Sequence, residues 1–142
     1  EEVRAEVRAR GGDVVVRGEF GRVDGDEVLL RQALSNLCRN AFEACAQARI
    51  APDIVIEGQR DPVHGVIRIS VSDNGPGVPD GVADRVFQPF FTTKAQGTGL
   101  GLALVQKIVV THNGRVTVAT GDGGGARFVV TLPALEAPVI SH

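Results

Sequence analysis

The segment from Asp26 to Ala48 constrains the fold of this chain more than any other. Its apolar residues recur at the three- and four-residue spacing of a helix that buries one face. These residues are Leu30, Leu34, Leu37, Ala41, Ala44 and Cys45. Asp26 is a suitable N-cap for this helix, and Pro52 lies just beyond its expected end. A long helix with one apolar stripe needs a sheet or other helices to cover that stripe.

Short runs rich in Val and Ile, bounded by glycine and other turn residues, predict the strands of such a sheet. The runs cover residues 13–18, 54–59, 66–73, 115–120 and 126–132. The first run is expected to form a hairpin with residues 20–24. The second and third are expected to pair through a turn at Asp61-Pro62, and the last two through residues 121–125.

Two further helices complete the predicted architecture. Residues 100–112 carry a helical stripe closed by Asn113-Gly114, and a short helix is expected to end near Phe87. Residues 88–98 have no clear period and are expected to form a mobile loop. Together the elements predict an α+β fold, a two-layer sandwich in which a mixed, mostly antiparallel sheet packs against three helices.

The length and the charge of the chain narrow its class. A chain of 142 residues suits one domain, expected over residues 1–142, with a core from about 13 to 133 and a frayed tail over 134–142. The formal net charge of −2 argues against nucleic-acid binding through bulk electrostatics. We therefore expect no nucleic-acid partner.

The cysteines and the length of the apolar runs indicate the cellular compartment in which the domain is expected. Cys38 and Cys45 lie about 10 Å apart along one predicted helix, too far for a disulfide, which fits a reducing compartment. No apolar run reaches the ~20 residues needed to span a membrane. We expect a cytoplasmic domain, part of a longer parent protein whose own membrane attachment the sequence leaves open.

Three polar residues beside the stripe of the first helix form one candidate site. Asn36, Asn40 and Glu43 project within a narrow arc, given about 100° of rotation per residue. Asn is a poor residue inside a helix, because its amide competes with the backbone for hydrogen bonds. One explanation is that the amides supply oxygen ligands to a hard cation and its phosphates, since Mg²⁺ needs few protein ligands. The other is that they hydrogen-bond to neighbouring loops.

A carboxylate followed by a glycine-rich turn forms a second candidate site. Asp73 ends a buried strand, and Gly75 and Gly77 follow at once. The carboxylate is suited to accept a hydrogen bond from a base amine, while the glycines let the backbone approach a planar ligand closely. An ordinary turn, in which Asp and Gly are common, explains the same residues. The alternating acidic ligands of an EF-hand are missing.

The run Gly97-Thr98-Gly99-Leu100-Gly101-Leu102, at the start of a predicted helix, forms the third. Free backbone N–H groups at a helix N-terminus attract phosphate, and small residues let it approach. The alternative is a flexible joint that leads into the helix. The spacing is neither a Rossmann fingerprint nor a P-loop.

These motifs occur in the order and spacing of a known family. LSNLCRNAFEA resembles the asparagine box of sensor histidine kinases, and DNGPGVP resembles their first glycine box. VFQPFFTTKAQGTGLGLALVQ resembles their phenylalanine box, ATP lid and second glycine box, while THNGRVTV and GGGARFVVTLP resemble the closing strands. The resemblance covers residues 13–133, and PFFTTK is in the style of the nitrogen-regulation type. It implies a catalytic and ATP-binding domain of the GHKL superfamily, with the Bergerat fold.

The resemblance implies a role for each matching residue. Asn40 would coordinate Mg²⁺ between the phosphates, and Asp73 would bind the adenine amine. Phe90 and Phe91 would anchor one end of the lid together with Phe87, and three Phe this close also indicate local core. Other residues expected at the nucleotide are Asn36, Arg39, Gly75, Gly77, Val78, Phe87, Thr92, Thr93, Lys94, Gly97, Thr98, Gly99, Leu100, Gly101 and Leu102. Lys94 would reach the terminal phosphate and Arg39 would touch a phosphate, with a solvated surface position as the alternative for each.

Asn36 separates two reaction types. Gyrase-type and mismatch-repair ATPases share this fold, and they resemble one another in a water-activating Glu four residues before the Mg²⁺ asparagine. Asn36 stands there instead, and an amide is not a base, so hydrolysis by that route is not expected. A histidine acceptor is itself a nucleophile near neutral pH, so transfer mainly requires positioning and charge neutralisation. The expected catalytic residues are Asn40, Lys94 and, as a candidate base, Glu43.

The histidines of the chain do not resemble a phosphoacceptor. His64 lies in a turn, His112 ends a helix where an imidazole meets the helix dipole favourably, and His142 is the last residue. The chain is therefore expected to bind ATP without phosphorylating itself, and to be a monomer. Its expected partners are the dimerisation and phosphoacceptor helices of the parent protein and, through them, a response regulator.

Two alternative functions and two departures from the family pattern stay open. An anti-sigma-type serine kinase shares the pocket but usually has a shorter lid, and a degenerate nucleotide-binding scaffold would only dock partners.

Ala126 stands where the family often has a threonine that supports the adenine site. Ala44 stands where some relatives have an aromatic residue that stacks on the base.

Overall fold

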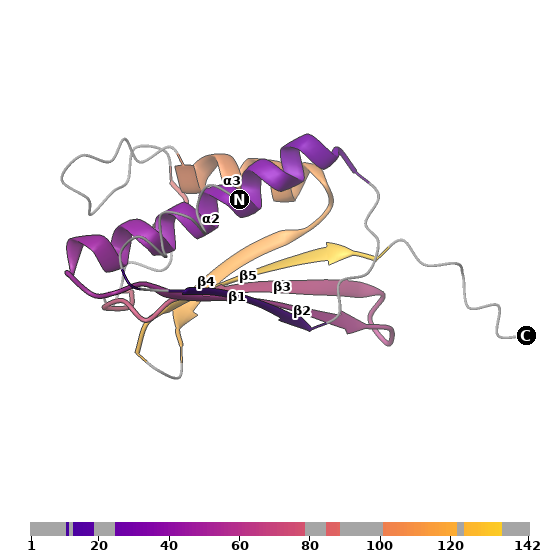
Figure 1. Ribbon diagram of the computed structural model, residues 1–142. Helices are drawn as coiled ribbons and strands as arrows, with labels where there is room; N and C mark the ends of the chain where they lie inside the picture. The colour runs from indigo at the N-terminus through magenta and orange to yellow at the C-terminus, as the bar shows by residue number, and fades with distance from the viewer. Residues whose placement is uncertain are drawn as a thin grey trace, which may run out of the picture.

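The computed structural model describes residues 11, 13–18, 25–78, 85–88, 101–121 and 124–134. Within them lie β1 (Asp13–Gly18), α2 (Glu27–Gln47), β2 (Asp53–Asp61), β3 (Val66–Ser72), α3 (Gly101–Thr111), β4 (Arg115–Thr120) and β5 (Ala126–Pro133). Both helices lie on one face of the sheet (Figure 1). The predicted α+β two-layer sandwich is confirmed. Of the predicted short helix, the structure describes only a turn at 85–88, and the rest lies outside the described residues.

The sheet has the order β1-β2-β3-β5-β4 and is mixed. The pairs β2–β3 and β4–β5 are antiparallel, as predicted for the two hairpins, and β3 and β5 also pair antiparallel. β1 runs parallel to β2, with Val15 opposite Val55. The described partner of β1 is β2. The hairpin expected between residues 13–18 and 20–24 stays a prediction, because residues 20–24 lie outside the described part of the chain.

The hydrophobic core lies between the sheet on one side and the helices α2 and α3 on the other. Leu37, Ala41 and Cys45 of the predicted stripe have no exposed surface, and Ile54, Val71 and Val130 of the sheet are buried to a similar degree. Phe87 packs edge-on against Phe128 at 6.1 Å between ring centroids, so the local-core explanation for Phe87 holds. Cys38 and Cys45 are buried free thiols. Neither described helix is long and apolar enough to cross a membrane.

His112 joins the end of α3 to the start of α2. Its Nε2 accepts a hydrogen bond from the backbone N–H of Asp26 at 3.0 Å, and its Nδ1 lies 2.8 Å from the carbonyl oxygen of Ile108. Both contacts form only when the imidazole is neutral with its proton on Nδ1. The ring leaves room for no side chain at Gly25, where a Cβ would lie 2.7 Å from Nε2. His112 thus links the end of α3 to the start of α2.

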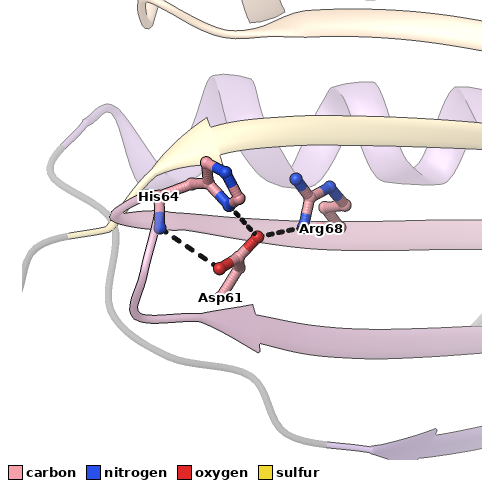
Figure 2. Close-up of polar contacts among 3 residues, drawn as sticks. All are labelled: Asp61, His64 and Arg68. Atoms are coloured by element: carbon pink, nitrogen blue, oxygen red, sulfur yellow. Dashed lines mark hydrogen bonds and ion pairs between the residues drawn. The ribbon is translucent and has the colours of Figure 1, made fainter.

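The turn between β2 and β3 is held by a small polar cluster, shown in Figure 2. Asp61 Oδ2 lies 2.7 Å from Arg68 Nη1 and 2.7 Å from His64 Nδ1, and Asp61 Oδ1 accepts from the backbone N–H of His64 at 3.2 Å. Hydrogen bonds from Arg68 and then His64 hold the pKa of Asp61 well below its usual range. His64 is 70% exposed and serves this turn, at the position that the sequence predicts.

Removing the N-cap of α2 is expected to destabilise the domain. Asp26 Oδ1 accepts a hydrogen bond from the backbone N–H of Leu29 at 3.1 Å, and Asp26→Ala leaves that donor to water. We expect a loss of about 1 kcal/mol in the free energy of unfolding, measured with urea. Asp26→Ser keeps an acceptor at the cap and should cost much less. Equal losses in the two variants would show that the cap contributes nothing.

Candidate functional site

Asp73 lies at the junction between the end of β3 and the start of β5. Its backbone N–H donates to the carbonyl oxygen of Ala126 at 3.0 Å. Its Oδ1 accepts from the backbone N–H groups of Gly75 at 2.8 Å and Ala126 at 3.2 Å. One carboxylate oxygen is therefore fully engaged by the backbone, which fixes the orientation of the group. The glycine-rich turn predicted from the sequence is thus held by hydrogen bonds to the side chain of Asp73.

The second oxygen of the same carboxylate has no partner. Within the described residues, Asp73 Oδ2 is the one buried side-chain oxygen or nitrogen atom without a hydrogen bond. Burial raises the pKa of Asp73, while the bonds from Gly75 and Ala126 partly oppose that shift. A buried acceptor left unpaired is costly. An exocyclic amine of a base has the donor that would satisfy it.

Glycines bring the two loops beside Asp73 into backbone contact. Gly77 has φ +85°, and a Cβ on it would lie 2.5 Å from the carbonyl oxygen of Gly124. A Cβ on Gly125 would collide with the carbonyl oxygen of Asp73. The first glycine was predicted to shape the pocket, whereas Gly125 was expected only as part of a turn. The close approach of the loops is a property that glycine alone permits.

The last turn of α2 lies beneath this junction. A Cβ on Gly75 would sit 3.1 Å from Asp73 Oδ1, 3.5 Å from Cys45 Sγ and 3.7 Å from the Cβ of Ala44. Burial, and then the charge of Asp73, raise the pKa of the Cys45 thiol, so it stays a hydrogen-bond donor. The small Ala44 side chain borders the same turn.

The predicted metal and phosphate residues of α2 line the helix next to the core. Asn36, Arg39, Asn40 and Glu43 are half-buried and precede the turn of α2 that borders the junction with Asp73. Among the described residues, the side chains of Asn36 and Asn40 have no hydrogen-bond partner, and residues 79–84 and 89–100, which could supply one, lie outside that part of the chain. Arg39 and Glu43 each interact with other residues of the chain. An amide oxygen without a partner is available as a ligand to a hard cation.

The remaining predicted residues fall into two groups. Gly101 and Leu102 start α3, where a Cβ on Gly101 would meet no atom within 4 Å, and Val78 and Leu102 pack partly buried against the core. Thr92, Thr93, Lys94, Gly97, Thr98, Gly99 and Leu100 lie outside the described residues, as do Phe90 and Phe91. The roles given to all of these residues at a nucleotide stay predictions.

Asn74 is a residue of the site that sequence reasoning treated only as part of a turn. Its side chain makes three hydrogen bonds, to the end of α2, to the connection that follows it and to the first residue of β2. The local sequence carries no signal for these bonds, because every partner lies more than 20 residues away along the chain.

Comparison with known proteins gives the family. Residues 25–136 match the family described as histidine kinase-, DNA gyrase B- and HSP90-like ATPases. The chain is 38% identical over 120 residues to the C4-dicarboxylate transport sensor protein DctS of Rhodobacter capsulatus, covering 84% of this chain and 18% of that protein. It is 40% identical over 111 residues to the sensor protein FixL of Bradyrhizobium diazoefficiens, covering 78% and 22%. The chain thus spans about a fifth of the length of these relatives.

Solved structures of histidine kinases have the same fold. The catalytic domain of ThkA in a nucleotide-free form superposes with a TM-score of 0.78 at 31% identity, covering 94% of this chain and 91% of that one. ThkA has also been solved in complex with the response regulator protein TrrA. Full-length ShkA in complex with AMPPNP gives a TM-score of 0.81 at 28% identity, covering 96% of this chain and 28% of that one. This chain belongs to the family of histidine kinase-, DNA gyrase B- and HSP90-like ATPases.

Proposed function

We propose that this chain is the catalytic and ATP-binding domain of a two-component sensor histidine kinase. It would transfer the γ-phosphoryl group of ATP to a histidine on a separate dimerisation domain of its parent protein. The unpaired, buried Oδ2 of Asp73 carries the proposal, because it is an acceptor placed between glycine loops with no donor of its own. The relatives named as sensor proteins, the histidine kinase ThkA and the structure solved with AMPPNP, an analogue of ATP, support the same function.

Asp73 would recognise the base. Its Oδ1 is held by the backbone of Gly75 and Ala126, so Oδ2 points in a fixed direction. The exocyclic amine of adenine would donate to Oδ2, whereas the carbonyl oxygen of guanine at the same ring position would face it with a second acceptor. The site would therefore select ATP over GTP.

Asn40 would supply one oxygen ligand to Mg²⁺, with Asn36, Arg39 and Glu43 on the same side of α2. Bound magnesium would neutralise charge that develops on the phosphates during transfer. With Asn36 where related ATPases have a base, no described side chain at that position removes a proton from water. The helix would therefore favour transfer to a nucleophile that is activated already, such as a neutral imidazole.

Asn40→Ala is expected to remove most of the gain in ATP affinity that Mg²⁺ confers. We expect that gain to be about tenfold, the scale of one contact to a charged group. Calorimetric titration with ATP, with and without Mg²⁺, measures it. Ser35→Ala, an exposed neighbour on the same helix, is the matched control and should bind as the unmutated protein does. Equal ATP affinity with and without Mg²⁺ in the unmutated protein would refute the role of Asn40.

Phosphoryl transfer itself is tested with the helical hairpin of the parent protein. The hairpin is mixed with this chain and γ-labelled ATP, and the label is then exposed to acid and to alkali. A phosphohistidine should lose its label in acid and keep it in alkali. Label that is stable in acid and lost in alkali would indicate a serine kinase, and bound ATP without any transfer would indicate a nucleotide-binding scaffold.

The wider arrangement follows from the same proposal. The domain would be a single unit over residues 1–142 and a monomer when isolated. The phosphohistidine of the parent would serve a response regulator, by analogy with the complex of ThkA and TrrA. Lys94, Thr92, Thr93 and the glycines at 97–101 would meet the phosphates, next to the start of α3.

A further inference from the structure

The side chain of Asn74 anchors the turn that presents Asp73. Although Asn74 is exposed, its Oδ1 accepts from the backbone N–H of Asp53 at 2.8 Å and from Cys45 Sγ at 3.2 Å. Its Nδ2 donates to the carbonyl oxygen of Ala51 at 2.9 Å. Cys45 belongs to the last turn of α2, Ala51 to the connection that follows, and Asp53 is the first residue of β2. One amide thus ties the end of β3 to two other parts of the fold.

The turn is held from opposite sides by two neighbouring residues. Asp73 binds the start of β5 through Ala126, while Asn74 binds the end of α2 and the start of β2. Pro52 is buried and lies between the two residues whose backbone groups Asn74 contacts, and its fixed φ makes this segment rigid. The direction of the unpaired Asp73 Oδ2 therefore depends on two sets of hydrogen bonds. Asp73 makes one set, and Asn74 makes the other.

The bonds require an amide at this position. One atom must accept from two donors while another donates to a carbonyl oxygen, and Asn provides both on a short side chain. An aspartate would lose the donation to Ala51 and add a second negative charge beside Asp73. A leucine of similar size would lose all three bonds.

We infer that Asn74 is a positioning residue for adenine recognition, because it fixes the turn that aims Asp73 Oδ2 at the base amine. The inference rests on the proposed function, in which Asp73 binds that amine. Asn74 itself touches no part of the nucleotide in this account. Its contribution should therefore show in the choice between bases rather than in general affinity for a triphosphate.

The experiment compares ATP with purine riboside triphosphate, which lacks the exocyclic amine. The ratio of the two dissociation constants isolates the contact between the amine and Asp73. We expect the unmutated chain to prefer ATP by about tenfold or more, and Asn74→Leu to bring the ratio close to one. Binding of the nucleotide without the amine should change by less than about threefold, because its contacts do not involve Asp73 Oδ2.

Two controls separate positioning from loss of stability. Asp61→Asn weakens the cluster at the far end of the same two strands (Figure 2) and should leave the ratio unchanged even where it lowers stability. Cys45→Ala removes one of the three bonds to Asn74, while Cys45→Ser keeps a donor there. We expect the ratio to fall about twofold to threefold in Cys45→Ala and to recover in Cys45→Ser. If Asn74→Leu does not fold, this pair decides the question.

The outcomes are distinct. A folded Asn74→Leu variant that keeps the ratio of the unmutated chain overturns the inference and leaves the proposed function standing. The same holds if Asn74→Leu does not fold and Cys45→Ala and Cys45→Ser have equal ratios. If the unmutated chain itself does not prefer ATP over the nucleotide without the amine, the adenine role of Asp73 is wrong, and the inference fails with it.

Discussion

Asp73→Asn is expected to weaken ATP binding by about 10- to 100-fold, the range set by losing a hydrogen bond to a charged group. The amide oxygen can still accept from the backbone of Gly75 and Ala126, so the turn keeps its shape. The amide nitrogen then takes the place of the unpaired Oδ2, where its hydrogens face those of the base amine. Fluorescence or calorimetric titration with ATP and GTP measures the effect, which should fall on ATP far more than on GTP.

The same substitution should leave the nucleotide-free domain at least as stable as before at neutral pH. Burial raises the pKa of Asp73, so the folded state holds this proton to a higher pH than the unfolded chain does. In the unfolded chain the pKa of this carboxyl is about 3.9. The free energy of unfolding therefore falls as the pH rises from that value through the pKa of the folded state, and it stays lower above it. The Asp73→Asn variant has no charge to bury at this position and lacks this dependence.

Urea unfolding of both proteins at pH 7 and at pH 4.5 tests that sign. The unmutated chain should gain stability relative to the Asp73→Asn variant as the pH is lowered. A variant that is clearly less stable at pH 7 would show that the carboxylate stabilises the fold. Equal binding of ATP and GTP to the unmutated chain would remove the recognition role from Asp73 altogether.

Gly125→Ala is expected to destabilise the domain by about 3 kcal/mol, at the upper end of the cost of overpacking, and to abolish ATP binding. The new Cβ would collide with the carbonyl oxygen of Asp73 and lie 2.9 Å from its Oδ1. Backbone cannot rotate away as a side chain can, so the junction between β3 and β5 must open. That movement breaks the bonds between Asp73 and Ala126 that orient the carboxylate.

Gly124→Ala is the matched neighbour for this test. Gly124 has φ +92°, but a Cβ there meets no atom within 4 Å, so only backbone strain of about 1–2 kcal/mol is added. Thermal or urea unfolding and ATP titration of both variants give the comparison. A Gly125→Ala variant that folds and binds as well as Gly124→Ala would mean that the loops do not approach as closely as the structure shows.

Local pattern was enough to predict the elements, because each is specified by its own residues. The stripe that ends at Cys45 predicted α2 to within a residue or two of Glu27–Gln47, and Asp26 is its cap. The β-branched runs predicted the strands equally well. The orientation of β1 could not be predicted in this way, since the run around Val15 fits a parallel or an antiparallel neighbour, and the contact with Val55 is set by the whole fold.

The candidate site was predictable in its motifs but not in its bonds. Asp73 and the glycines after it stand out in the sequence because of their chemistry. The bonds from Ala126 to Asp73, from Asp53 to Asn74 and from Asp26 to His112 join residues 53, 21 and 86 positions apart. The periodicity of the sequence does not predict such distant pairs. That Asp73 Oδ2 is buried without a partner can be known only from the folded structure.

Titration of this chain with ATP in the presence and absence of Mg²⁺, with GTP in parallel, tests the central claim most directly. The account predicts saturable binding of ATP that Mg²⁺ strengthens, and a preference for ATP over GTP of about tenfold or more. Absence of saturable binding at millimolar ATP, with the domain folded, would contradict the claim that Asp73 and its glycine loops form a nucleotide site.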